Sequence, residues 1–154
     1  RRGVPFSILN IGDGELMTEF VHECNRQEQT DNIINTGLVK NPEKYLSAMD
    51  VFILPSLYEG LPVVGIEAQA NELPCVFSDI ITREVDVLSD SNRYINLGSD
   101  ITVWVDSLIV LSRMRQKMIQ DGNAMKKLKD HGFEISDAAD KLCNFYMKLA
   151  NGKN

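Results

Sequence analysis

The sequence predicts an α/β fold, a Rossmann-like, doubly wound parallel sheet flanked by helices. Short and continuously apolar runs recur along the chain, as expected for strands that are buried on both faces of a parallel sheet. They alternate with longer segments in which apolar residues recur at helical spacing. Turns that contain glycine or proline separate the two kinds of segment. Strands that alternate with helices in this way pair in parallel, which defines the fold class.

The first third of the chain is expected to hold two strands and two helices. Gly12-Asp13-Gly14 closes the first strand, and Asp13 is expected to cap the helix that follows. Pro42 is expected to begin the second helix, because proline lacks an N–H that the first helical turn would leave unpaired. The expected bounds are residues 6–11 and 32–36 for the strands, and residues 15–28 and 42–49 for the helices.

The rest of the chain is expected to continue the same alternation within one domain. The expected strands are residues 51–54, 75–78 and 94–97. One helix is expected to begin at Pro62. Further helices are expected over residues 83–87, 101–111, 113–131 and 136–150. Residues 1–150 would then form a single domain, and residues 151–154 a frayed tail.

Composition excludes several classes of function. The net charge of −6 and the pI near 4.9 argue against non-specific binding to nucleic acid or to an anionic membrane. The three cysteines, Cys24, Cys75 and Cys143, are widely spaced, form no metal-ligand cluster and indicate a reducing compartment. No apolar run has the length of a membrane span, and no signal peptide is recognised. We therefore expect a cytoplasmic domain that does not bind nucleic acid.

Two glutamates at the predicted helix start of Pro62 are the most informative feature of the sequence. Glu59 and Glu67 are separated by seven residues, and no Lys or Arg occurs between positions 45 and 82. With a helix that begins at Pro62, Glu67 is expected on an apolar arc with Val63 and Ile66. A carboxylate without a cation on a buried face is costly unless a polar ligand donates hydrogen bonds to it. The alternative is an ordinary helix edge with Glu67 in solvent.

Four polar or glycine-bearing turns are expected at one rim of the sheet, where open α/β folds bind ligands. These turns are residues 12–14, 37–40, 56–62 and 78–80. Gly12-Asp13-Gly14 is not a dinucleotide fingerprint, because the third glycine is missing at the required spacing. Ser56 has no histidine near it in sequence, so a hydrolase triad is not supported.

The motif and its neighbours resemble the C-terminal, donor-binding domain of retaining GT-B glycosyltransferases, whose hallmark is Glu, seven residues, Glu. Beyond Glu59 and Glu67, the turn at residues 12–16, the approach at residues 48–52 and the run at residues 68–76 match this family in order and spacing. The Glu-Gly-Leu-Pro variant at residues 59–62 is similar to enzymes of bacterial capsular polysaccharide and exopolysaccharide synthesis. The resemblance covers residues 6–111 and identifies the fold as half of a GT-B enzyme.

This resemblance implies a transferase that moves a sugar from a nucleotide-sugar, expected to be a UDP-sugar, to a glycan or lipid-linked acceptor with retention. Glu67 would accept hydrogen bonds from the ribose, and Glu59 would position the transferred sugar as the catalytic residue. Backbone groups would contact the sugar, the diphosphate and the base. By resemblance these groups belong to Gly60, Leu61, Pro62 and Val63, to Gly12 beside the nucleotide, and to Val39 and Lys40 in the base loop.

The sequence also departs from the family pattern. The Arg and Lys that clamp the diphosphate in the family, the first strand and helix of this domain and the acceptor-binding domain are not recognised. We therefore expect a truncated donor-binding domain, inactive in isolation, whose acceptor and any contact with the cytoplasmic face of a membrane depend on the missing part. No Asp-x-Asp pair is present, so neither a cofactor nor a metal is expected. A non-catalytic nucleotide-sugar binding module and a GT-B-type epimerase remain as alternatives.

Overall fold

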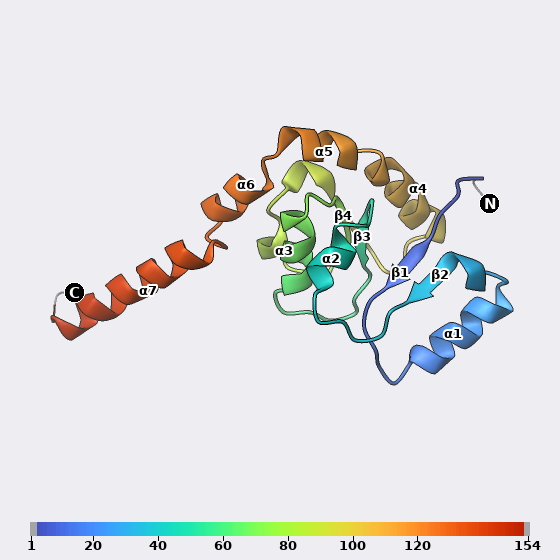
Figure 1. The fold of residues 1–154 in the computed structure, drawn as a ribbon, viewed down its shortest axis with the longest axis horizontal. Helices are drawn as coiled ribbons and strands as arrows, with labels where there is room; N and C mark the ends of the chain where they lie inside the picture. The colour runs from blue at the N-terminus through green and yellow to red at the C-terminus, as the bar shows by residue number, and fades with distance from the viewer. Residues whose placement is uncertain (1–2, 153–154) are drawn as a thin grey trace. The chain divides into compact units, whose positions relative to one another are not determined.

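The computed structural model describes residues 3–152 and divides the chain into two compact units, residues 1–45 and residues 46–154 (Figure 1). Each unit contains one parallel sheet and helices that follow its strands. The predicted fold class is thereby confirmed as α/β, with parallel sheets flanked by helices. The strands are divided between a two-stranded sheet, β1-β2, and a three-stranded sheet, β3-β4-β5.

The first unit is a strand–helix–strand segment with a parallel two-stranded sheet. Its elements are β1 (Ile8–Asn10), α1 (Met17–Arg26), the 3₁₀ turn η1 (Thr30–Asn32) and β2 (Ile33–Asn35). Leu9 of β1 lies opposite Ile34 of β2. The predicted cap at Asp13 is wrong, because a turn over residues 14–16 delays the helix and Asp13 Oδ1 accepts a hydrogen bond from the Gly14 N–H instead. The short helix α2 (Pro42–Leu46) joins the units and begins at Pro42, as predicted.

The second unit is built on the parallel sheet β3-β4-β5. Its strands are β3 (Phe52–Leu54), β4 (Cys75–Ser78) and β5 (Asn92–Ile95). Helix α3 (Val63–Ala70) connects β3 to β4, and the 3₁₀ turns η2 (Arg83–Val85) and η3 (Ser89–Ser91) lie between β4 and β5. The fifth strand begins two residues earlier than residue 94, the start expected from the sequence.

Four helices follow β5 within the described residues 3–152, one more than the sequence predicted. They are α4 (Ile101–Ser112), α5 (Arg115–Asp121), α6 (Ala124–Asp130) and α7 (Ile135–Ala150). The predicted single helix over residues 113–131 is wrong, because Gly122 ends α5 in the left-handed conformation, with φ of 57°. Its N–H donates to the Met118 carbonyl, which closes the helix as a glycine C-cap does.

The core of the second unit lies on both faces of β4. Cys75 and Phe77 belong to one buried cluster, together with Ile66 of α3, whereas Val76 belongs to a second cluster with Trp104 of α4. Successive residues of a strand point to opposite faces of the sheet, so α3 and α4 cover opposite sides of it (Figure 1). This helix placement is the doubly wound arrangement that the sequence predicted, and it leaves the carboxyl ends of β3 and β4 beside the start of α3.

Candidate functional site

The start of helix α3 is the centre of the candidate site. Pro62 is the N-cap residue rather than the first helical residue, because its ψ of 100° is extended. The Pro62 carbonyl accepts a hydrogen bond from the Gly65 N–H at 2.9 Å, and no side chain caps the helix. The N–H groups of Val63 and Val64 precede this first bond and are therefore available to a ligand. A helix start of this kind carries positive potential and suits an anionic group.

The Glu59 carboxylate lies in the loop between β3 and α3 and is held by a serine hydroxyl. Ser56 Oγ donates to Glu59 Oε1 at 2.9 Å, and Glu59 itself is exposed. The loop is also tied to the neighbouring strand, because Ser78 Oγ at the end of β4 donates to the Ser56 carbonyl at 2.6 Å. Glu59 is therefore accessible, while its carboxylate is held by Ser56 and the backbone of its loop is held at Ser56 by Ser78.

Glu67 is exposed, so of the two interpretations that the sequence left open, the structure shows the helix edge with Glu67 in solvent. The arc of α3 expected to be buried included Val63, but that side chain is 61% exposed. The buried residues of the helix are Gly65, Ile66, Ala68 and Gln69, so Glu67 lies on the solvent side. Among residues 3–152, no hydrogen bond or ion pair is found for the Glu67 carboxylate. The carboxylate is available to a ligand because it is exposed and has no partner among these residues. Burial without a counterion, the argument made from the sequence, does not apply to it.

Gly65 sets which face of α3 is buried. A Cβ at this position would lie 3.0 Å from Phe77 Cε1 and 3.0 Å from Val85 Cγ2, both in fully buried side chains. Only glycine lets the helix approach β4 and the η2 turn this closely. The same approach directs Glu67 outward, because residue 67 is two positions further along the helix.

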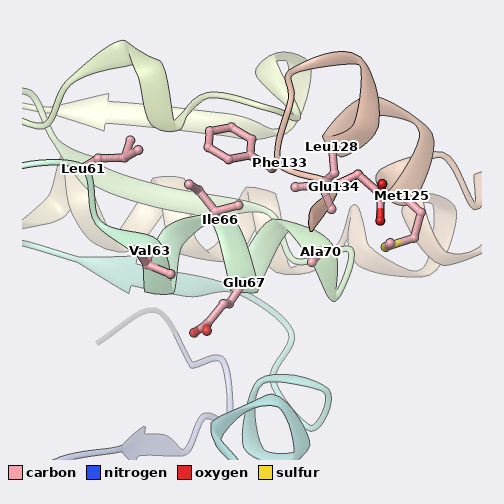
Figure 2. Close-up of a pocket in the computed structure, with 9 residues that line it drawn as sticks. All are labelled: Leu61, Val63, Ile66, Glu67, Ala70, Met125, Leu128, Phe133 and Glu134. Carbon is pink, nitrogen blue, oxygen red and sulfur yellow. The ribbon is translucent and has the colours of Figure 1, made fainter. Parts of the chain in front are cut away.

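An apolar groove of about 370 Å³ runs along α3 next to Glu67 (Figure 2). Figure 2 shows the Glu67 carboxylate directed away from Ile66 and Phe133, which line the groove. The other residues that line the groove are Leu61, Val63, Ala70, Met125, Leu128 and Glu134, together with Glu67 itself at its edge. The carboxylate therefore projects outside the apolar surface, where a hydroxylated ligand could reach it.

The predicted residues of the first unit also lie together within that unit. The Gly12 N–H donates to the Gly37 carbonyl at 3.0 Å, which joins the turn after β1 to the turn after β2. Gly12 has φ of 129° and Gly37 has φ of 65°, conformations that favour glycine. Val39 is half-buried and Lys40 is exposed in the loop that follows. Each unit thus gathers its own predicted residues at the carboxyl ends of its strands.

Arg83 is the first cation after the Glu59 motif, and it is engaged elsewhere. Its guanidinium lies 3.3 Å from the centroid of the Tyr94 ring. Burial, followed by the charge of Asp86, raises the pKa of Tyr94 to about 12, so the ring keeps its hydroxyl proton at neutral pH. Arg83 therefore stabilises the loop after β4 and neutralises neither Glu59 nor Glu67.

Residues 3–152 contain neither a group of side chains suited to a metal ion nor a helix suited to cross a membrane. No group of three or more His, Cys, Asp or Glu side chains in this part of the chain is arranged to hold a metal ion. In the same range, no helix combines the length and the apolar character needed to cross a membrane.

Comparison with known families decides the affiliation of the chain. The model of the family described as glycosyl transferases group 1 matches residues 1–112. The chain belongs to this family. The matched range contains both units' predicted site residues, from Gly12 to Glu67, and ends at the last residue of α4.

Several relatives of this chain are bacterial proteins that are named as glycosyltransferases. The chain is 32% identical over 148 residues to the putative glycosyltransferase EpsF of Bacillus subtilis (strain 168), covering 94% of this chain and 37% of the relative. It is 30% identical over 156 residues to the UDP-Gal:alpha-D-GlcNAc-diphosphoundecaprenol alpha-1,3-galactosyltransferase of Escherichia coli, covering 97% of this chain and 39% of the relative. The chain thus spans less than half the length of these relatives. Further relatives bear the names of amylovoran and capsular polysaccharide biosynthesis glycosyltransferases.

The crystal structure of TarM has a fold similar to that of this chain. The two align with a TM-score of 0.69 at 20% sequence identity, over 90% of this chain and 28% of TarM. The likeness to TarM supports the predicted GT-B fold.

The sequence predicted roles for Glu59, Glu67 and the start of α3, but it did not indicate the groups that hold Glu59 and its loop. Ser56 was considered only as a nucleophile, and Ser78 only as part of a polar turn. Their spacing to Glu59 in the sequence carries no pattern, since the contact depends on the pairing of β3 with β4. The available signal would have been two serines near the ends of neighbouring strands, one two residues after β3 and the other the last residue of β4.

Proposed function

We propose that the full-length protein transfers a sugar from a UDP-sugar to a glycan or lipid-linked acceptor, with retention, in bacterial surface polysaccharide synthesis. This chain would supply the donor-binding part. The observation that carries the proposal is the start of α3, where an uncapped helix end is flanked by two exposed carboxylates, Glu59 and Glu67. This combination suits a ligand with a diphosphate in its middle and hydroxyl groups at both ends.

Each group has one role in this proposal. Glu67 accepts hydrogen bonds from the ribose, and Glu59 accepts them from the transferred sugar. The backbone of Gly60–Val63 contacts the sugar and the diphosphate, with Pro62 contributing its carbonyl only. The main catalytic demand is to stabilise the charge that develops on the departing phosphate, and the helix start supplies positive potential there. Retention follows from attack on the same face of the sugar as the leaving group, with help from that phosphate.

In the first unit, Gly12 lies beside the nucleotide, and the loop of Val39 and Lys40 holds the base. Backbone groups of this loop make these contacts, so the exposed position of Lys40 is compatible with the role. The name of the Escherichia coli relative, which specifies UDP-Gal and a diphosphoundecaprenol acceptor, supports a UDP-sugar and a lipid-linked acceptor here. A cytoplasmic location is also proposed, supported by three cysteines that are all free thiols.

The test of the function uses the full-length protein with UDP-galactose, UDP-glucose and UDP-N-acetylglucosamine. We expect UDP release from at least one of them, increased by a diphosphoundecaprenol-linked sugar acceptor, and NMR of the product should show the anomeric configuration of the donor. Conversion of the donor into its epimer without transfer would instead identify an epimerase. Tight UDP-sugar binding without any turnover would identify a binding module. A product of inverted configuration would disprove retention.

Metal independence is part of the same proposal, because the helix start and the basic pair expected outside this chain would balance the diphosphate charge. We expect full activity of the full-length enzyme in EDTA. Loss of activity in EDTA and its recovery with Mn²⁺ or Mg²⁺ would contradict this part of the proposal and leave the transfer reaction itself unaffected.

A further inference from the structure

Two serines at the ends of adjacent strands form a continuous connection to Glu59. Ser78 is the last residue of β4 and is fully buried, and its hydroxyl donates to the Ser56 carbonyl at 2.6 Å. Ser56 follows β3 by two residues, and its own hydroxyl donates to Glu59 Oε1 at 2.9 Å. Because β3 and β4 pair in register, with Leu54 opposite Phe77, the two serines are brought together by the sheet itself.

The two hydrogen bonds fix different parts of the Glu59 loop. The bond from Ser78 holds the backbone at the point where the chain leaves β3. The bond from Ser56 holds the carboxylate, whose neighbours Leu57 and Tyr58 are 84% and 90% exposed and offer no packing support. An exposed glutamate in such a loop would otherwise sample several rotamers, and each misplacement weakens contacts that depend on position.

We propose that Ser56 is the positioning residue of Glu59 and that Ser78 anchors Ser56 to the sheet. This inference rests on the proposed function, in which Glu59 contacts the transferred sugar. Ser56 does not contact the substrate in this account and acts only through the carboxylate. Its loss should therefore lower kcat and leave nucleotide affinity unchanged, since UDP lacks the sugar that Glu59 contacts.

The experiment compares Ser56→Ala, Ser56→Thr and Glu59→Ala in the full-length enzyme with the best donor from the UDP-sugar panel. We expect Ser56→Ala to lower kcat about tenfold, as for a lost hydrogen bond to a charged group, with Kd for UDP unchanged. Ser56→Thr keeps the hydroxyl and should restore most of kcat. The double variant Ser56→Ala/Glu59→Ala should be no slower than Glu59→Ala alone, because both changes remove the same contact.

The buried anchor is tested with Ser78→Ala against Ser112→Ala. Ser112 in α4 also donates its hydroxyl to a backbone carbonyl, that of Ile109 at 3.1 Å, but has no connection to the Glu59 loop. Both variants lose one hydrogen bond of the same kind, and we expect only Ser78→Ala to lower kcat. Equal effects of the two variants on kcat would overturn the role of Ser78.

The outcomes separate this inference from the proposed function. If Glu59→Ala lowers kcat while Ser56→Ala does not, the positioning role is wrong and the function stands. If Glu59→Ala retains full kcat, the assigned role of Glu59 fails, and the positioning role fails with it. A slowed double variant, in which the two losses multiply, would show that Ser56 acts independently of Glu59 and would also overturn the inference.

Discussion

Gln69 and Glu67 lie two residues apart on the same helix, and their polar side chains have opposite environments. The Gln69 side chain is fully buried; its Nε2 donates to the carbonyls of Gly65 and Val85, at 3.0 Å and 2.7 Å. Its Oε1 accepts from Val87 N at 2.9 Å, Leu88 N at 2.7 Å and Asn92 Nδ2 at 2.9 Å. Glu67, in contrast, is exposed and has no polar partner among residues 3–152.

The comparison separates a residue that holds the fold from a residue that is free to bind. A buried polar group is tolerated only when its hydrogen bonds are satisfied, and Gln69 satisfies both ends of its amide. In doing so it joins α3 to the turn before β5, which keeps the helix fixed against the sheet. Glu67 makes no contribution of this kind, so its presence on a fixed helix is better explained by an external ligand.

The largest expected effect is on the buried side of the helix. Gln69→Leu keeps a similar volume but removes five hydrogen bonds and leaves the Leu88 N–H without its partner. We expect the free energy of unfolding to fall by about 2–4 kcal/mol, measured by urea denaturation of the full-length protein. Asn71→Ala, which removes an exposed amide bonded to the Glu67 carbonyl, is the control and should cost less than about 0.5 kcal/mol. If both variants lost the same free energy of unfolding, the buried Gln69 network would not be what holds the helix against the sheet.

A smaller effect is expected at the close approach between α3 and β4. Gly65→Ala places a methyl group 3.0 Å from Phe77 and Val85, which are both fully buried. We expect a destabilisation of about 1–3 kcal/mol, measured in the same way. Gly60→Ala is the control for stability, because a Cβ there meets no atom within 4 Å. A neutral Gly65→Ala would mean that the helix can shift outward, and the direction of Glu67 would no longer be fixed by this contact.

The sequence predicted the fold class, because it depends on local patterns, and the assignment of the site to the start of α3 stays a prediction. The apolar run at residues 75–78 matched β4 without error, because a short, continuously apolar run between turn residues is typical of a strand buried on both faces. It did not predict the burial of α3, because Val63 and Ile66 are equally apolar and only the contact of Gly65 with Phe77 decides which one is buried. Gln69 was missed for the same reason, as its five partners are brought together only by the folded turn at residues 85–92.

The smallest effect is a stabilisation at the C-terminal end of α3. Glu72 follows the helix with φ of 57°, a left-handed conformation that costs energy for any residue with a Cβ. The Leu73 N–H donates to the Ala68 carbonyl at 3.1 Å across this position, as in a Schellman motif. Glu72→Gly should therefore raise the free energy of unfolding by about 0.5–1 kcal/mol, whereas Glu72→Ala should not. A thermal melt that ranks the two variants equally would contradict the account of this cap.

The most direct test of the donor site is the affinity of the Glu67→Ala variant for UDP, measured by titration calorimetry with the full-length protein and accompanied by a thermal melt. The account predicts that Kd for UDP rises about tenfold or more, because a charged acceptor of the ribose hydroxyls is lost. It also predicts an unchanged melting temperature, because Glu67 is exposed and unpaired among residues 3–152. An unchanged Kd, or a lowered melting temperature with unchanged affinity, would show that Glu67 is not part of the nucleotide site.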